Sequence, residues 1–172
     1  MAIEKPEYRV LSKIGDIEIR HYSEYWLAEC DVSTVKDLRS ASNQAFNRLF
    51  SYISGDNSRG QKIAMTSPVQ QIPAAAGWKV SFVVPKTFSP EHIPVPSSQA
   101  IRLRKVEAGT FAALRYRGVW NNRVFETKSA ELLAGVSAAG RMPIGEVSSA
   151  VYNPPLTPPP LRRNEVLVRV SD

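Results

Sequence analysis

The sequence predicts an α+β fold in which an antiparallel sheet, curled into a barrel, packs against two α-helices. The prediction rests on strand-like alternation, on helical periodicity, and on the return of the same element order in the second half of the chain. Neither half could bury its sheet face and helix alone. We therefore expect one domain over residues 1–172, with pseudo-twofold repeat halves of about 6–97 and 98–172.

The first half opens with residues that alternate between the two faces of a strand. Ile17, Ile19 and His21 share one parity, and Glu18, Arg20 and Tyr22 share the other. Residues 25–32 are expected to be the hairpin partner of this strand. From Val35 the apolar residues recur every three or four positions, which predicts an amphipathic helix over residues 35–54. Strands are then expected over residues 62–69 and 78–84.

The second half repeats this order with little residue identity. Residues 100–106 and 111–116 alternate like a hairpin around Gly109. A second helix is expected over residues 121–138, followed by strands over 146–152 and 165–170.

Composition limits the classes of protein that the chain can represent. It is 43% hydrophobic and 22% charged, which is typical of a globular protein. The net charge of +6 suits an anionic ligand or surface. We expect no membrane insertion, because no apolar run approaches about 20 residues and the opening residues lack the apolar core of a signal peptide. The single cysteine, Cys30, favours a cytoplasmic location.

Four separated motifs resemble those of the SOUL/haem-binding protein family, and they occur in the family's order. They are residues 17–22 (IEIRHY), residues 51–57 (SYISGDN) followed by 62–69 (KIAMTSPV), residues 152–155 (YNPP), and residues 162–166 (RRNEV). The resemblance covers nearly the whole chain. It implies a duplicated, twisted β-barrel flanked by two helices, and a soluble protein that binds haem or another tetrapyrrole. It also implies a cleft between the first helix and the loop before the last strand.

A haem site requires an apolar slot and cations for the two propionates. The residues expected to form the slot are Phe46, Leu49, Phe50, Ile53, Met65 and Leu161, and the expected cations are Arg48, Arg162 and Arg163. Arginine suits this task because its guanidinium binds a carboxylate through two hydrogen bonds. Two alternatives stay open: the helix residues form core, and the segment 162–165 pins the proline-rich loop to the barrel.

His21 is the candidate axial ligand of the haem iron, because some relatives place a histidine at this motif position. A histidine that shares its strand face with Ile17 and Ile19 is more often a hydrogen-bonded core residue, and we expect the structural role. Two histidines and one cysteine form no metal or catalytic motif, so no catalytic residue is predicted.

The leading hypothesis is a haem or tetrapyrrole carrier, buffer or scavenger that holds its ligand reversibly rather than as a permanent cofactor. One alternative is an enzyme that removes the metal from a tetrapyrrole or modifies its ring. Another is a sensor, since the barrel-and-helix plan resembles the effector domains of multidrug-responsive regulators, which usually carry a buried glutamate for cationic drugs. Nucleic-acid binding is not expected, because the chain lacks a basic stripe interleaved with aromatic residues.

Overall fold

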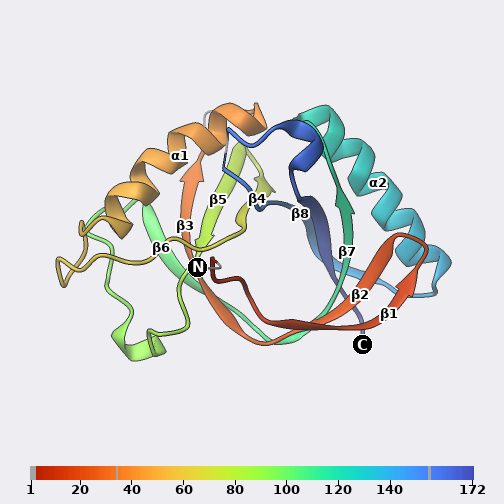
Figure 1. The fold of residues 1–172 in the computed structure, drawn as a ribbon, viewed down its shortest axis with the longest axis horizontal. Coiled ribbons are helices and arrows are strands. Elements are labelled where there is room, and N and C mark those ends of the chain that lie inside the picture. Colours follow the sequence, from red (N-terminus) through yellow and green to blue (C-terminus); the bar gives the residue numbers. More distant parts are fainter. Residues whose placement is uncertain (1–2, 34, 155) are drawn as a thin grey trace.

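A computed structural model describes residues 3–33, 35–154 and 156–172, so Pro155 of the YNPP motif lies outside the described residues. Two helices lie on the outer side of one curved, nine-stranded antiparallel sheet (Figure 1). The strands are β1 (Tyr8–Ile14), β2 (Ile17–Tyr22), β3 (Tyr25–Val32), β4 (Val69–Ala74), β5 (Gly77–Val83), β6 (Ile101–Val106), β7 (Gly109–Tyr116), β8 (Pro143–Val151) and β9 (Asn164–Val170). The helices are α1 (Leu38–Ile53) and α2 (Asn122–Ala138), with short 3₁₀ turns at Pro90–His92 and Pro159–Leu161.

The strand order reveals the predicted duplication. The order across the sheet is β1-β2-β7-β9-β8-β4-β5-β3-β6. Exchanging β2 with β6, β3 with β7, β4 with β8 and β5 with β9 reverses this order and leaves only β1 without a counterpart. The α+β class, the antiparallel pairing, the two helices and the pseudo-twofold arrangement are therefore confirmed.

The two predicted hairpins at the start of each half are wrong. β2 pairs with β7 and β3 pairs with β6, and the register continues unchanged from Tyr22 opposite Gly109 to Tyr25 opposite Val106. Each supposed hairpin is thus one long, bent strand, because residues 23–24 and 107–108 lack turn formers such as Asn-Gly. Gly109 has no positive φ; a Cβ there would lie 2.1 Å from Nη1 of Arg169, so glycine makes room for that guanidinium.

The expected strand over residues 62–69 is also displaced, since β4 begins only at Val69 and Thr66 forms just an isolated bridge with Glu4. Pro68 has no N–H to donate to a neighbouring strand, which accounts for the later start. Strand β1 was not expected at all, because residues 8–14 do not alternate clearly between apolar and polar.

The sheet has two ends, β1 and β6, and no pairing among the described residues joins them. The predicted barrel is therefore an open, curved sheet. The residues that precede β6 are interrupted by Pro85, Pro90, Pro94 and Pro96, so no strand equivalent to β1 forms on the outer edge of β6.

The helices cover the outer face of the sheet, α1 over β3 and β5, and α2 over β7, β8 and β9. Helix α1 begins three residues later than expected because the Asp37 side chain accepts a hydrogen bond from the Ser40 amide and caps the helix. The N-terminal ends of the helices meet at Asn122, which accepts a hydrogen bond from the Leu38 amide (2.7 Å) and donates one to the Lys36 carbonyl (2.9 Å). None of the helices in the described part of the chain is long and apolar enough to cross a membrane.

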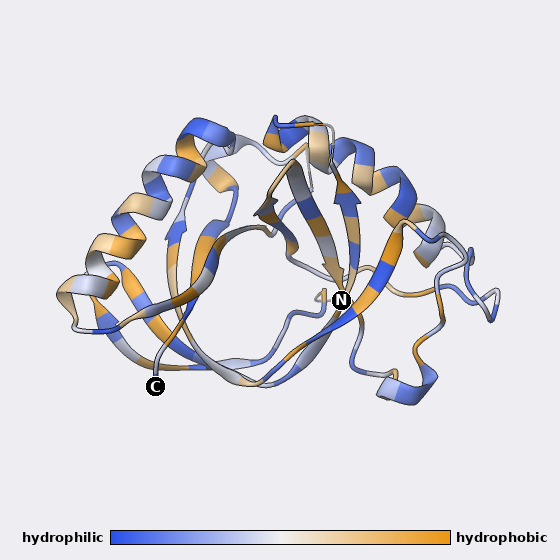
Figure 2. Cartoon of the chain, turned by 180° about the vertical axis from the view of Figure 1, so that it is seen from behind, coloured by the Kyte–Doolittle hydropathy of each residue, from blue (hydrophilic) through white to orange (hydrophobic). Residues whose placement is uncertain are grey.

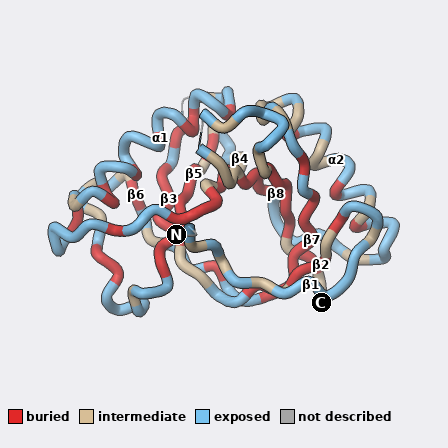
Figure 3. The backbone as a smooth tube through the Cα atoms, in the orientation of Figure 1, coloured by how far each residue is buried: buried red, intermediate tan, exposed pale blue. Residues whose placement is uncertain are grey.

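The main core lies between the helices and the outer face of the sheet, and the strands alternate between hydrophobic and hydrophilic residues (Figure 2). The other side of the sheet, here called the inner face, carries a second apolar cluster around Tyr22, Leu27, Phe111 and Leu167. Most strands are therefore buried along much of their length, whereas β1 at the sheet edge and the solvent side of each helix are exposed (Figure 3). This second face positions the charged groups described below.

Candidate functional site

The predicted apolar slot divides into exposed and buried residues. Phe46 and Phe50 stack on each other on α1, with ring centroids 5.8 Å apart, and are 47% and 51% exposed. Leu49 and Ile53 are buried in the core under the same helix. Met65 and Leu161 lie in loops and are exposed. Phe46 and Phe50 are thus available to a ligand, and Leu49 and Ile53 support the helix that carries them.

Arg48 lies on the opposite flank of α1 from the phenylalanine pair. Successive helix residues are rotated by about 100°, so position 48 points about 200° away from position 46. The Arg48 guanidinium accordingly contacts β3, where it lies 3.4 Å from the Asp31 carbonyl oxygen. Arg39, by contrast, shares the flank of Phe46 and Phe50, and no ion pair holds it within the described parts of the chain.

The two arginines before β9 differ in their surroundings. Arg162 donates a hydrogen bond to the Thr157 carbonyl (2.8 Å) and so lies within the proline-rich loop. Arg163 stacks on the Tyr152 ring at 3.9 Å and donates hydrogen bonds to Glu165 Oε2 (2.9 Å) and to the Tyr8 hydroxyl (3.2 Å). Its backbone amide also donates to Asn153 Oδ1. These are the contacts of a residue that pins the loop to the sheet, as one of the two sequence alternatives expected.

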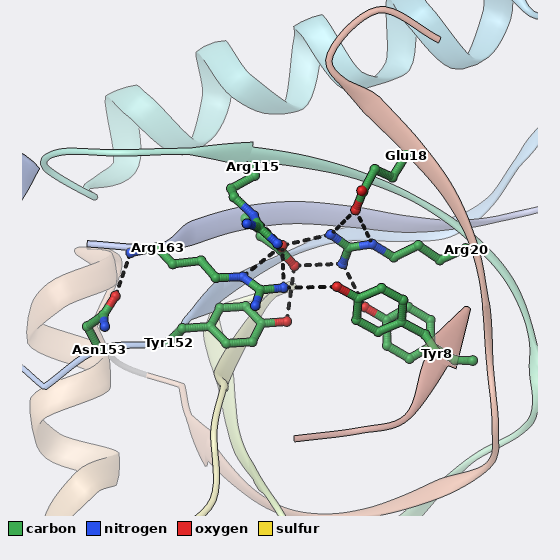
Figure 4. Close-up of polar contacts among 9 residues, drawn as sticks. Tyr8, Glu18, Arg20, Arg115, Tyr152, Asn153 and Arg163 are labelled. Atoms are coloured by element: carbon green, nitrogen blue, oxygen red, sulfur yellow. Dashed lines mark hydrogen bonds and ion pairs between the residues drawn. The ribbon is translucent and has the colours of Figure 1, made fainter. Parts of the chain in front are cut away.

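Arg163 belongs to a buried ion cluster that the sequence did not predict (Figure 4). Arg20 and Glu165 are fully buried and form two hydrogen bonds of 2.8 Å each. Arg20 also donates to Glu18 Oε1 (2.7 Å) and lies over the Tyr8 ring at 4.3 Å. The sequence signal for this cluster was the alternation along residues 17–22, which places Arg20 on the same strand face as Tyr22. The structure shows that both residues are buried there.

The charges of this cluster stabilise one another. Burial alone would raise the pKa of the Glu165 carboxyl, but the hydrogen bonds and positive charges of Arg20 and Arg163 lower that pKa to about 2. Burial would lower the pKa of Arg20, and the neighbouring Glu165 instead raises it. Burial and the Glu165 charge raise the pKa of Tyr152, whose hydroxyl donates to Glu165 at 3.0 Å. Glu165 is therefore ionised at neutral pH and already paired.

A second buried acid of the inner face is paired in the same way. Glu29 is 1% exposed and contacts Arg104 at 3.0 Å and Arg102 at 3.5 Å. Each of these two buried carboxylates thus has at least two arginine partners, so neither negative charge is left unpaired for a cationic ligand.

Neither of two cavities formed by described residues is lined by a residue of the predicted haem slot. A cavity of about 310 Å³ lies on the inner face and is lined by Tyr25, Gln70, Arg104, Phe111, Leu167 and Arg169, among others. A cavity of about 190 Å³ lies between residues 4–7 and 83–93.

His21 lies on β2, opposite Arg9 of β1 and Thr110 of β7, and is half-buried. β2 is part of the half of the sheet that α2 covers, whereas Phe46 and Phe50 are on α1. The structure therefore does not bring His21 to the phenylalanine pair. The described residues contain no cluster of three or more His, Cys, Asp or Glu side chains that could hold a metal ion.

Solved structures show where this fold occurs elsewhere. The C-terminal domain of EcmrR superposes with a TM-score of 0.68, covering 96% of this chain and 98% of that domain, at 11% sequence identity. A hydrolase from Listeria innocua superposes with a TM-score of 0.59 at 9% identity, covering 94% of each chain. At such identities the similarity concerns the fold alone.

Sequence comparison finds relatives of higher identity than these solved structures. "Heme-binding protein 1" of Sus scrofa is 27% identical to this chain in an alignment 176 residues long. The alignment covers 96% of this chain and 92% of that protein. "Heme-binding protein 1" of Bos taurus is 26% identical over 147 residues, covering 81% of this chain and 76% of that protein. The model of the SOUL heme-binding protein family matches residues 3–169. Since the match extends over nearly the whole chain and its motifs occupy the elements described above, the chain belongs to the SOUL heme-binding protein family.

Proposed function

We propose that this protein binds haem or a related tetrapyrrole reversibly, as a carrier, buffer or scavenger, on the exposed flank of α1. The observation that supports this placement is the stacked, half-exposed pair Phe46 and Phe50. Two aromatic rings held at that exposure cost free energy in water and offer a flat apolar surface of the kind that a porphyrin face can cover.

The flank of α1 that carries Phe46 and Phe50 also offers a cation that could pair with the haem propionates. Arg39 lies seven residues before Phe46, about 10 Å along the helix axis, and faces the same side. Among the predicted cations, Arg48 contacts β3 and Arg163 is engaged by Glu165, so we assign the first propionate contact to Arg39. Arg162 stays the proposed second cation because the family resemblance places its loop beside the first helix. Met65 and Leu161 are the proposed contacts from the loops that follow α1 and precede β9.

We propose that His21 does not ligate the iron, because it lies in the half of the sheet covered by α2. Binding then depends on apolar contact and propionate pairing rather than on an axial bond. Iron-free protoporphyrin IX should consequently bind within about tenfold of ferric haem, a difference of about 1.4 kcal/mol.

Titration of the purified protein with ferric haem and with protoporphyrin IX tests the proposal, with the Soret band and tryptophan quenching as readouts. Phe46→Ala and Phe50→Ala should each weaken both ligands at least about tenfold. Leu133→Ala is the matched control, because Leu133 is an exposed apolar residue on α2. Equal affinities for all three variants would contradict the placement, and loss of haem binding with a changed spectrum in His21→Ala would show an axial histidine.

The sensor alternative for cationic drugs loses its main support in this chain. The buried glutamate that such a site requires would be Glu165 or Glu29, and each is already paired with two or more arginines. Reversible binding is therefore the function that the geometry favours.

A further inference from the structure

The inner-face cavity is a candidate ligand site separate from α1. Its volume of about 310 Å³ is at the lower end of the range for small-molecule pockets, about 300–1,000 Å³. Six strands contribute to its lining: β3, β4, β6, β7, β8 and β9. The floor is aromatic and aliphatic, with Tyr25, Phe111 and Leu167, and Gln70 donates a hydrogen bond to the Tyr25 hydroxyl at 3.2 Å.

The charged residues that line the cavity determine whether its ligand is an anion or a cation. Arg104 is paired with Glu29, and Lys105 is paired with Glu24 and Glu107. Arg169 donates hydrogen bonds to the carbonyls of Glu107 (2.6 Å) and Ala108 (3.4 Å) and lies over the Phe111 ring at 4.5 Å. Within the described residues it has no carboxylate partner.

The acidic residues near the cavity do not cancel its preference for an anionic ligand. Glu107 and Glu146 lie on the rim and are exposed, so water and salt screen their charges. The buried acids of the inner face, Glu29 and Glu165, are each saturated by arginines. A guanidinium that lies over an aromatic ring and lacks a counter-ion is suited to a carboxylate.

We propose that this cavity is a second binding site, independent of the haem site, for a small aromatic carboxylate. The apolar ring of the ligand packs on Tyr25, Ile72 and Ile144, none of which is fully buried, and its carboxylate pairs with Arg169. Gly109 contributes to this arrangement, because a Cβ there would lie 2.1 Å from Nη1 of Arg169 and would displace the guanidinium from its present position. The cavity volume selects a ligand of one or two rings.

Calorimetric titration with 2-naphthoate and with 2-naphthylmethylammonium tests the proposal, because the two probes share a ring system and differ in charge. The carboxylate should bind, and the ammonium compound should bind at least about tenfold more weakly. Arg169→Gln should weaken 2-naphthoate at least about tenfold. Arg117→Gln, which changes an exposed arginine outside the cavity, should leave the affinity unchanged.

Haem titrations on the same variants separate this site from the proposed haem site. Arg169→Gln should bind haem as the unchanged protein does, and saturating haem should not displace 2-naphthoate. Displacement by haem, equal binding of the two probes, or equal weakening by Arg169→Gln and Arg117→Gln would each overturn the proposal. If the protein failed to bind haem at all, the naphthoate result would still stand by itself.

Discussion

Arg20 and Glu165 show how single residues join distant parts of this chain. They are 145 positions apart, and their two hydrogen bonds connect β2 to β9 on the inner face. Arg163 and Tyr152 attach the loop before β9 to the same carboxylate. Removing one partner of such a pair leaves a buried charge without full compensation, which costs much more than losing a surface ion pair.

Arg20→Met should therefore lower the free energy of unfolding by about 3 kcal/mol or more. Arg163 and Arg115 remain near Glu165 and keep the effect toward the lower end of what a broken buried pair costs. Urea denaturation followed by circular dichroism measures the change. Arg117→Met is the matched control and should change the free energy of unfolding by less than about 0.5 kcal/mol. A similar loss in both variants would show that the buried pair contributes no more to stability than an exposed arginine does.

Glu165 also gives the protein a defined dependence on acid. Its carboxyl pKa is about 2 in the folded protein, against an ordinary value of 4.5. The unfolded chain takes up this proton at higher pH, so the stabilisation is complete above pH 4.5 and is lost as the pH falls from 4.5 toward 2. Unfolding midpoints across this window should fall steeply for the unchanged protein and less steeply for Glu165→Gln. Parallel curves would contradict this origin of the acid sensitivity.

The elements of the fold depend on local signals at their ends. Helix α2 begins where the Asn121 side chain accepts a hydrogen bond from the Val124 amide at 2.9 Å. Periodicity predicted the helix within one residue at its start, because the apolar spacing and this capping residue agree. The long strands lacked such a signal: nothing at residues 23–24 or 107–108 marks a reversal, and the pairing register continues unchanged across these residues.

Asn121→Ala should lower the free energy of unfolding by about 1 kcal/mol, because it removes the acceptor for one unpaired amide of the first turn. Asn121→Asp keeps an acceptor at the same place and should retain most of the stability. Thermal denaturation of the two variants distinguishes them. Equal melting temperatures would mean that packing against β7, β8 and β9 determines the start of α2 without help from the cap.

At the scale of the whole molecule, the two halves are interleaved rather than placed side by side. β2 pairs with β7, β3 with β6, and β4 with β8, so three ladders connect residues from different halves. A half expressed alone would expose the edges and apolar faces of these strands. We propose on this ground that the whole chain is one domain.

Separate chains of residues 6–97 and 98–172 should each lack dispersed amide signals in NMR spectra, and the full chain should unfold in a single transition. The full chain provides the control for both measurements. A half that gives a dispersed spectrum, or two transitions in the full chain, would show that the repeat halves are separate domains.

The sequence by itself determined the fold class, the two helices, the duplication and the family, because periodicity and motif order are properties of neighbouring residues. It also indicated which residues of α1 could present an apolar flank, and Phe46 and Phe50 are indeed exposed together. Only the tertiary structure decided that His21 lies in the half of the sheet that α2 covers and that Arg20 meets Glu165. These outcomes depend on how distant strands pair and on which sheet face becomes buried, and no local pattern contains that information.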